Sequence, residues 1–76
     1  MRCTLSDIRP GERCIVVSIG GGGAIRRRLF DMGITPHTEI AVQKLAPLGD
    51  PMELKVRGYE LCIRKSEAEK IAVERV

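Results

Sequence analysis

The sequence predicts an all-β domain, a small five-stranded antiparallel barrel with one inserted α-helix. The first observation is length: 76 residues, 43% of them hydrophobic, suit a single domain over residues 1–76, and a chain of this size buries roughly 60% of its unfolded surface. Second, most apolar residues lie in short segments that alternate with polar ones or are rich in β-branched side chains, as in strands. Third, one stretch alone, residues 24–32, spaces its apolar residues as a helix does.

Five segments have the length and composition of strands. In chain order they are residues 14–19, 38–45, 52–57, 59–64 and 71–76. The third and fourth alternate apolar and charged residues in the same phase, and Gly58 between them can supply the positive φ of a tight reversal, so the two are predicted to form a hairpin. This register turns the following side chains inward: Met52, Leu54, Val56, Tyr59, Leu61 and Ile63. It turns Cys62 toward solvent.

Two single helical turns accompany the strands. Thr4, with Asp7 three residues later, has the pattern of a capping box at the start of a turn that carries Leu5 and Ile8. Ser66 with Glu67, Ala68 and Glu69 has the same pattern before the last strand. Short, strongly bent strands of this number close into a barrel of the SH3-like kind, which leaves few sheet edges exposed.

Residues 20–33 do not fit a strand pattern. Four consecutive glycines open the stretch, and a short helix follows. The apolar stripe of this helix consists of Ile25, Leu29 and Met32. Gly33 occupies the position of a left-handed C-terminal cap, and Pro36 prevents the helix from continuing. The sequence therefore predicts a short capped helix that packs one face on the barrel.

The glycine run has two interpretations. A glycine-rich loop before a helix can present backbone N–H groups to a phosphate. Here no Gly-Lys-Ser/Thr follows, and the third glycine of a Gly-x-Gly-x-x-Gly motif is missing. We therefore expect a flexible hinge that lets the helix pack on the barrel, rather than a nucleotide site.

Arg26, Arg27 and Arg28 lie at the front of the helix, where the helix dipole disfavours positive charge. One interpretation is a solvated face on which Arg27 pairs with Asp31 at i+4, a contact that contributes only about 0.3 kcal/mol. The other is a recognition surface for an acidic partner, anionic lipid or nucleic acid, and the residues alone favour neither interpretation. Nucleic acid is the weakest of these partners, because one Tyr and one Phe do not make a stacking platform.

The remaining residues indicate a reduced, non-catalytic protein. The chain has an odd number of cysteines, Cys3, Cys14 and Cys62, and no two of them form a Cys-x-x-Cys pair. This argues against a disulfide framework or a preassembled zinc site. Cys62 is either a plain exposed thiol or a ligand in a weak metal site between molecules, and His37 suits a turn. No Ser/His/Asp, Cys/His or paired-carboxylate arrangement can be assembled, so we expect no enzyme. The apolar runs are too short for a membrane span or a secretory segment, which predicts a cytoplasmic protein.

Four blocks of the sequence, in order, resemble the FeoA family. These are small cytoplasmic proteins of bacterial ferrous iron transport with an SH3-like barrel. The blocks are AIRRRLFDMGITP (24–36), APLGDP (46–51), VRGYEL (56–61) and RKSEA (64–68). The resemblance extends from Leu5 to about Glu74. The three cysteines lie outside the family pattern, and His37 stands where many members carry glycine.

The resemblance implies a non-enzymatic accessory protein that binds and modulates FeoB, the membrane Fe(II) transporter with a cytoplasmic G-protein domain. It implies a monomer or weak dimer, located through its partner at the inner face of the cell membrane. No cofactor is required, weak binding of a divalent metal (Fe2+ or Zn2+) is possible, and neither nucleic acid binding nor membrane insertion is expected. By position, the implied partner-binding residues are Arg26, Arg27, Leu29, Asp31, Met32, Gly33, Leu48, Gly49, Asp50, Pro51, Arg57, Gly58 and Tyr59.

Two other functions stay open. The same barrel is the C-terminal module of some iron-dependent transcriptional repressors, which suggests a regulatory or metal-sensing module. DNA affinity with a steep salt dependence would be typical of that function. Alternatively, the arginines act as a finger on the G-protein domain of FeoB and stimulate GTP hydrolysis.

Overall fold

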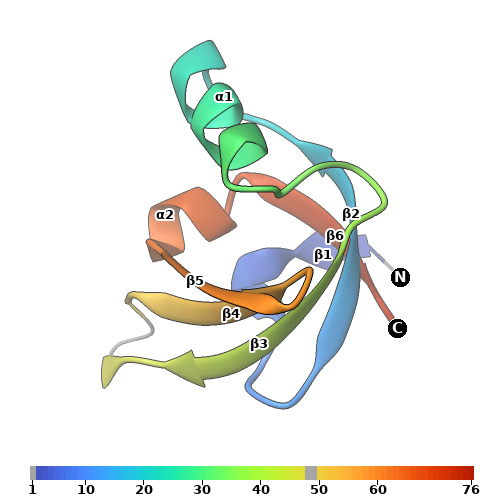
Figure 1. Ribbon diagram of the computed structural model, residues 1–76, viewed down its shortest axis with the longest axis vertical. Coiled ribbons are helices and arrows are strands. Elements are labelled where there is room, and N and C mark those ends of the chain that lie inside the picture. The colour runs from blue at the N-terminus through green and yellow to red at the C-terminus, as the bar shows by residue number, and fades with distance from the viewer. Residues whose placement is uncertain (1, 48–49) are drawn as a thin grey trace.

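The structure is a computed structural model that describes residues 2–47 and 50–76. Within these residues, six strands form one antiparallel sheet in the order β1-β6-β2-β3-β4-β5. The strands are β1 (Arg2–Thr4), β2 (Arg13–Ile19), β3 (Glu39–Leu45), β4 (Met52–Val56), β5 (Tyr59–Ile63) and β6 (Ile71–Arg75). The helices are the 3-10 turn η1 (Leu5–Asp7), α1 (Gly23–Asp31) and α2 (Lys65–Ala68). Figure 1 shows a strongly curled sheet with α1 standing clear of it at one end.

The core lies inside the curl of the sheet. Alternate residues of the strands supply most of it, and η1, α1 and α2 close its ends. Its buried side chains are Leu5, Ile8, Cys14, Val16, Ile19, Leu29, Ile34, Ile40, Val42, Met52, Leu54, Val56, Ile63, Ala68, Ile71 and Val73. Because burial of apolar surface is the main favourable term in folding, this single cluster holds the barrel together.

The all-β barrel is confirmed, and all five predicted strands form. The β4–β5 hairpin has the predicted two-residue turn, with Val56 paired to Tyr59. Gly58 has the expected positive φ of 89°, and Arg57 also has a positive φ, 51°. Two successive positive φ angles are the geometry of a type I′ turn, which matches the right-handed twist of the flanking strands.

The sixth strand, β1, was not expected from the sequence. Its three residues pair with β6, with Arg2 opposite Glu74 and Cys3 opposite Val73. Arg2 Nε also lies 3.6 Å from Glu74 Oε1. A three-residue strand has too little pattern to be recognised locally, and its partner is at the other end of the chain.

Tyr59 lies on the predicted inner face, opposite the buried Val56, but it is not itself buried. Met52, Leu54, Val56 and Ile63 are buried as expected, and Leu61 is half-buried. Tyr59, however, is 50% exposed. It is the first residue after the hairpin turn, so its ring lies beyond the end of the core and extends toward the segment that follows α1.

The first helical turn is confirmed and the cap of the second is corrected. Thr4 N–H donates to Asp7 Oδ2 at 3.1 Å, as in the predicted capping box. At α2, however, the helix begins at Lys65, and Arg64 N–H donates to Glu67 Oε1 at 2.9 Å. Ser66 therefore lies inside the first turn and is not its cap. The sequence pattern was misleading because the cap of Lys65 comes from a distant residue, described below.

Helix α1 ends as predicted. Gly33 has φ 92°, its N–H donates to the carbonyl of Phe30 at 2.9 Å, and Ile34 N–H donates to the carbonyl of Leu29 at 3.0 Å. These two hydrogen bonds form a Schellman motif, which satisfies the last carbonyls of the helix. Ile34 then enters the core as a fully buried residue. The C-terminal end of α1 is thus tied to the barrel.

Candidate functional site

Helix α1 presents most of its side chains to solvent. It lies at the end of the barrel where β2 ends, and it stands apart from the sheet (Figure 1). Leu29 is the buried residue of the helix, so its side chain is unavailable to a partner. Ile25 and Met32 are half-buried against the core, in agreement with the predicted stripe. The remaining surface of the helix carries the arginines.

The three arginines lie in three different environments. Arg28 Nη1 is 2.8 Å from Glu67 Oε2, whose side chain is only 6% exposed. The guanidinium of Arg26 lies over the ring of Phe30, 5.5 Å from its centroid, in a cation–π contact. Arg27 is exposed, and no ion pair joins it to Asp31 among the described residues. Of the three, Arg27 is the one whose charge faces solvent without such a contact.

A shallow groove of about 630 Å³ runs along the outer side of α1. We call it the α1 groove, and its lining residues are Gly23, Ala24, Arg27, Arg28, Asp31 and Met32. Glycine and alanine at one end leave room beside the Arg27 side chain. The groove thus combines apolar surface from Ala24 and Met32 with one negative and two positive side chains.

Gly33, just after α1, lies against Tyr59 of the hairpin. A Cβ atom at Gly33 would lie 2.9 Å from the Tyr59 hydroxyl oxygen, closer than van der Waals contact permits. Gly33 is therefore required for its positive φ, and a side chain at this position would also displace the Tyr59 hydroxyl, which is the end of a half-exposed side chain. Both residues were expected to contact a partner, and the structure shows that they contact each other.

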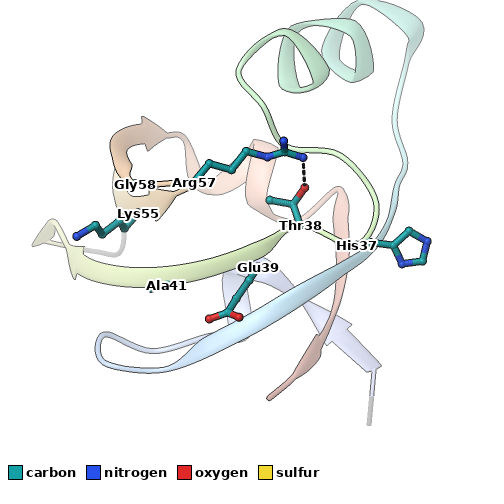
Figure 2. Close-up of a pocket in the computed structure, with 7 residues that line it drawn as sticks. All are labelled: His37, Thr38, Glu39, Ala41, Lys55, Arg57 and Gly58. Atoms are coloured by element: carbon teal, nitrogen blue, oxygen red, sulfur yellow. Dashed lines mark hydrogen bonds between the residues drawn. The ribbon is translucent and has the colours of Figure 1, made fainter.

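Arg57 makes a second link between the hairpin and the segment after α1. Its Nη2 donates to Thr35 Oγ1 and to Thr38 Oγ1, both at 3.2 Å, and the two hydroxyls are 2.9 Å apart. Figure 2 shows the guanidinium turned toward Thr38. Thr38 is only 5% exposed, so this contact fixes the guanidinium to a buried group.

Beside this contact lies a depression of about 470 Å³, which we call the hairpin hollow. Its lining residues, drawn in Figure 2, are His37, Thr38, Glu39, Ala41, Lys55, Arg57 and Gly58. Ala41 and Gly58 are small and leave the space open. His37 adopts φ 72° in the turn before β3, in agreement with its predicted turn position.

Asp50 caps helix α2. Its Oδ1 accepts a hydrogen bond from Lys65 N–H at 3.1 Å, and with Pro51 and Arg64 it lines a small hollow. The Asp50–Pro51 peptide bond is cis. Leu48 and Gly49, which were also expected to bind a partner, lie outside the described residues.

The implied binding residues therefore do not form one site. Arg27, Asp31 and Met32 share the α1 groove, with Arg26 on an adjoining side of the helix. Gly33, Arg57, Gly58 and Tyr59 lie at the hairpin, and Asp50 and Pro51 lie at α2. Sequence reasoning missed Glu67 and Thr38, whose polar groups are buried. One sequence feature could have identified Glu67 as a cap, namely its position as an acidic residue in the first turn of a helix.

The thiols and carboxylates do not assemble into a metal centre within residues 2–47 and 50–76, where no group of three potential ligands is found. Burial is the main cause that raises the pKa of the Cys14 thiol to about 12, with smaller effects from Cys3, Glu12 and Glu39. Cys14 is thus a neutral core residue, whereas Cys62 is exposed as predicted. In the same described part of the chain, no helix has the length and apolar character needed to span a membrane.

The curled antiparallel sheet with a helix inserted between β2 and β3 defines a domain of the SH3-like class. A family model for the FeoA domain matches residues 3–75. The chain therefore belongs to the FeoA family.

Several FeoA proteins are similar to this chain in sequence or structure. A Fe(2+) transport protein A/Fe(2+) transporter FeoB fusion protein of Porphyromonas gingivalis is 34% identical over 70 residues, which are 92% of this chain and 8% of the fusion protein. The crystal structure of an iron uptake regulatory protein (FeoA) is 36% identical over 100% of both chains, with a TM-score of 0.92. FeoA of Stenotrophomonas maltophilia complexed with zinc, a procaryotic SH3 domain protein, is 28% identical over 95% of this chain and 89% of that chain, with a TM-score of 0.82.

The barrel also occurs in a manganese-dependent transcriptional repressor. That protein superimposes with a TM-score of 0.91 at 16% identity, and this chain covers 99% of its own length and 41% of the repressor. At such low identity the likeness shows the shared fold alone.

Proposed function

We propose that this protein is a non-catalytic accessory protein of bacterial Fe2+ uptake, which binds the membrane transporter FeoB on its cytoplasmic side and modulates transport by conformational coupling. The observation that carries the proposal is the P. gingivalis relative, in which FeoA and FeoB are one fusion protein. Two modules joined in one chain in one organism are reasonable binding partners where they are separate chains.

The α1 groove and the neighbouring Arg26–Phe30 pair are the proposed docking surface. Phe30 is 36% exposed although it is aromatic, and Arg26 stacks on it. Arginine and aromatic side chains, including phenylalanine, are enriched in the cores of protein interfaces. Arg27 adds a positive charge that has no carboxylate partner among the described residues. We expect a partner surface with an acidic group opposite Arg27 and an apolar group on Phe30.

Charge reversal on α1 tests this surface. We expect the double substitution R26E/R27E to abolish measurable binding of the cytoplasmic portion of FeoB, measured by biolayer interferometry with purified, folded protein. A matched control is R9E/K44E, because both residues are exposed, lie outside α1 and have no ion pair among the described residues. Equal binding by wild type and R26E/R27E would show that α1 is the wrong surface.

Weak divalent metal binding is a separate part of the proposal. The zinc complex of the S. maltophilia relative supports it. We expect calorimetric titration with Zn2+ to give weak binding that Cys62→Ser reduces further, because Cys62 is the exposed thiol. Tight, stoichiometric binding that survives this substitution would contradict the proposal.

A further inference from the structure

The hairpin hollow contains a positive charge that the protein holds in place without neutralising it. The acceptors of Arg57 Nη2 are two threonine hydroxyls, which are uncharged. In the described part of the chain, Arg57 has no carboxylate partner, and its Nε and Nη1 have no hydrogen-bond acceptor. A guanidinium has five N–H donors in a fixed plane. Arg57 therefore has donors that remain available to a ligand.

The other charges of the hollow do not cancel that of Arg57. Glu39 is the acidic residue in the lining, and its Oε2 lies 3.3 Å from Arg13 Nη1. Lys55 adds a second positive charge, and its side chain has no ion pair among the described residues. Although β-sheet register places Glu60 opposite Lys55, the two do not form an ion pair. The lining is thus positive overall.

The arrangement of these charges selects the kind of anion. Figure 2 shows that the side chains of Lys55 and Arg57 extend in opposite directions from the hairpin. They do not converge on one point, as the groups that bind a doubly charged phosphate do. A single guanidinium with free donors suits a singly charged carboxylate, with which it makes charge-assisted hydrogen bonds.

We propose that the hairpin hollow binds a carboxylate through Arg57, and that this carboxylate is an Asp or Glu side chain of the docking partner. The second part rests on the proposed function; the first does not. The Thr35 and Thr38 hydroxyls already hold the guanidinium in place. Binding of a ligand to it therefore costs little further side-chain entropy. This contact lies on the barrel and is separate from the α1 groove.

Binding of small anions tests the first part without any partner. Isotope-labelled protein would be titrated with N-acetyl-glutamate amide and, separately, with inorganic phosphate, while NMR follows the Arg57 Nε–H and the amides of Thr38 and Gly58. We expect saturable shifts with the carboxylate in wild type and in Lys44→Gln, and none in Arg57→Gln. No saturable shift, shifts that survive Arg57→Gln, or shifts with phosphate alone would each overturn the proposal. The Arg57 Nε–H reports the contact in wild type even if a variant folds poorly.

Partner binding tests the second part. We expect Arg57→Gln to weaken binding of the cytoplasmic portion of FeoB by about twofold to fivefold at low salt, as for an ion pair near the surface, and less at high salt. Lys44→Gln should bind as wild type does. If R26E/R27E abolishes binding but Arg57→Gln leaves it unchanged, the docking function stands and the assignment of the hollow to the partner fails. If FeoB does not bind at all, the docking function fails, and the small-anion titration still decides whether the hollow binds a carboxylate.

Discussion

Removal of the Glu67 carboxylate should destabilise the whole domain. This side chain is 6% exposed and lies 2.8 Å from Arg28 on α1, while its other oxygen accepts the N–H of Arg64 at 2.9 Å. One carboxylate thus caps α2 and links it to α1. Substitution by alanine removes both contacts and leaves a polar group of the backbone without its partner.

The two contacts differ in size. Because Arg64 is exposed and water can reach its N–H, loss of this cap costs about 0.5–2 kcal/mol. The ion pair contributes less, about 0.5–1 kcal/mol, because the Arg28 side chain is 60% exposed and returns to water. Together they predict that Glu67→Ala lowers the free energy of unfolding by about 1–3 kcal/mol. Glu67→Gln keeps an acceptor for Arg64 and loses the charge, so we expect a loss of about 1 kcal/mol.

Urea unfolding followed by circular dichroism measures these differences. Glu69→Ala is the matched control, because Glu69 follows α2, is exposed and has no ion pair among the described residues. It should change stability by no more than about 0.5 kcal/mol. In a domain of this size, 1 kcal/mol corresponds to about 4–8 °C in Tm. Equal unfolding free energies for Glu67→Ala and Glu69→Ala would refute the role given to Glu67.

Substitutions at three other residues test separate parts of the structure. Gly33→Ala should cost about 1–3 kcal/mol, because φ is 92° and a Cβ would lie 2.9 Å from the Tyr59 hydroxyl; a melting temperature equal to that of wild type would contradict this. Asp50→Ala should cost about 1 kcal/mol through loss of the Lys65 cap, and Asp50→Asn much less; equal losses would argue against capping. The pKa of Cys14 rises from 9.0 to about 12 on folding. The contribution of the buried neutral thiol to stability is complete below pH 9.0, declines by about 1.4 kcal/mol per pH unit as pH rises from 9.0 to about 12, and is lost above that. Urea unfolding at alkaline pH should therefore show the difference between wild type and Cys14→Ala shrinking, and a constant difference would contradict the assigned cause.

The parts of the fold that the sequence predicted are those with local causes. Alternating residues specified the β4–β5 hairpin, and the turn needed Gly58. The cap of α1 was predictable because Gly33, Ile34 and Pro36 lie within four consecutive residues. In each case the residues that determine the structure are neighbours in the chain.

The parts that the sequence did not predict depend on contacts between distant residues. Strand β1 exists because it pairs with β6 at the other end of the chain. Asp50 caps a helix that begins 15 residues later, so the capping pattern at Ser66 was misleading. The same limit applies to the candidate site. The arginine run looked uniform in sequence, and only the three-dimensional positions of Glu67 and Phe30 distinguish Arg28 and Arg26 from Arg27.

Mapping the contact surface by NMR tests the proposed docking most directly. Isotope-labelled protein would be titrated with the unlabelled cytoplasmic portion of FeoB, and the amide shifts would be assigned to positions on the barrel. We expect the largest changes at Ala24, Arg27 and Asp31 in the α1 groove, with a second set at Gly58 beside the hairpin hollow. Changes confined to the outer face of β2 and β6, around Ile15 and Arg75, would contradict the proposed surface.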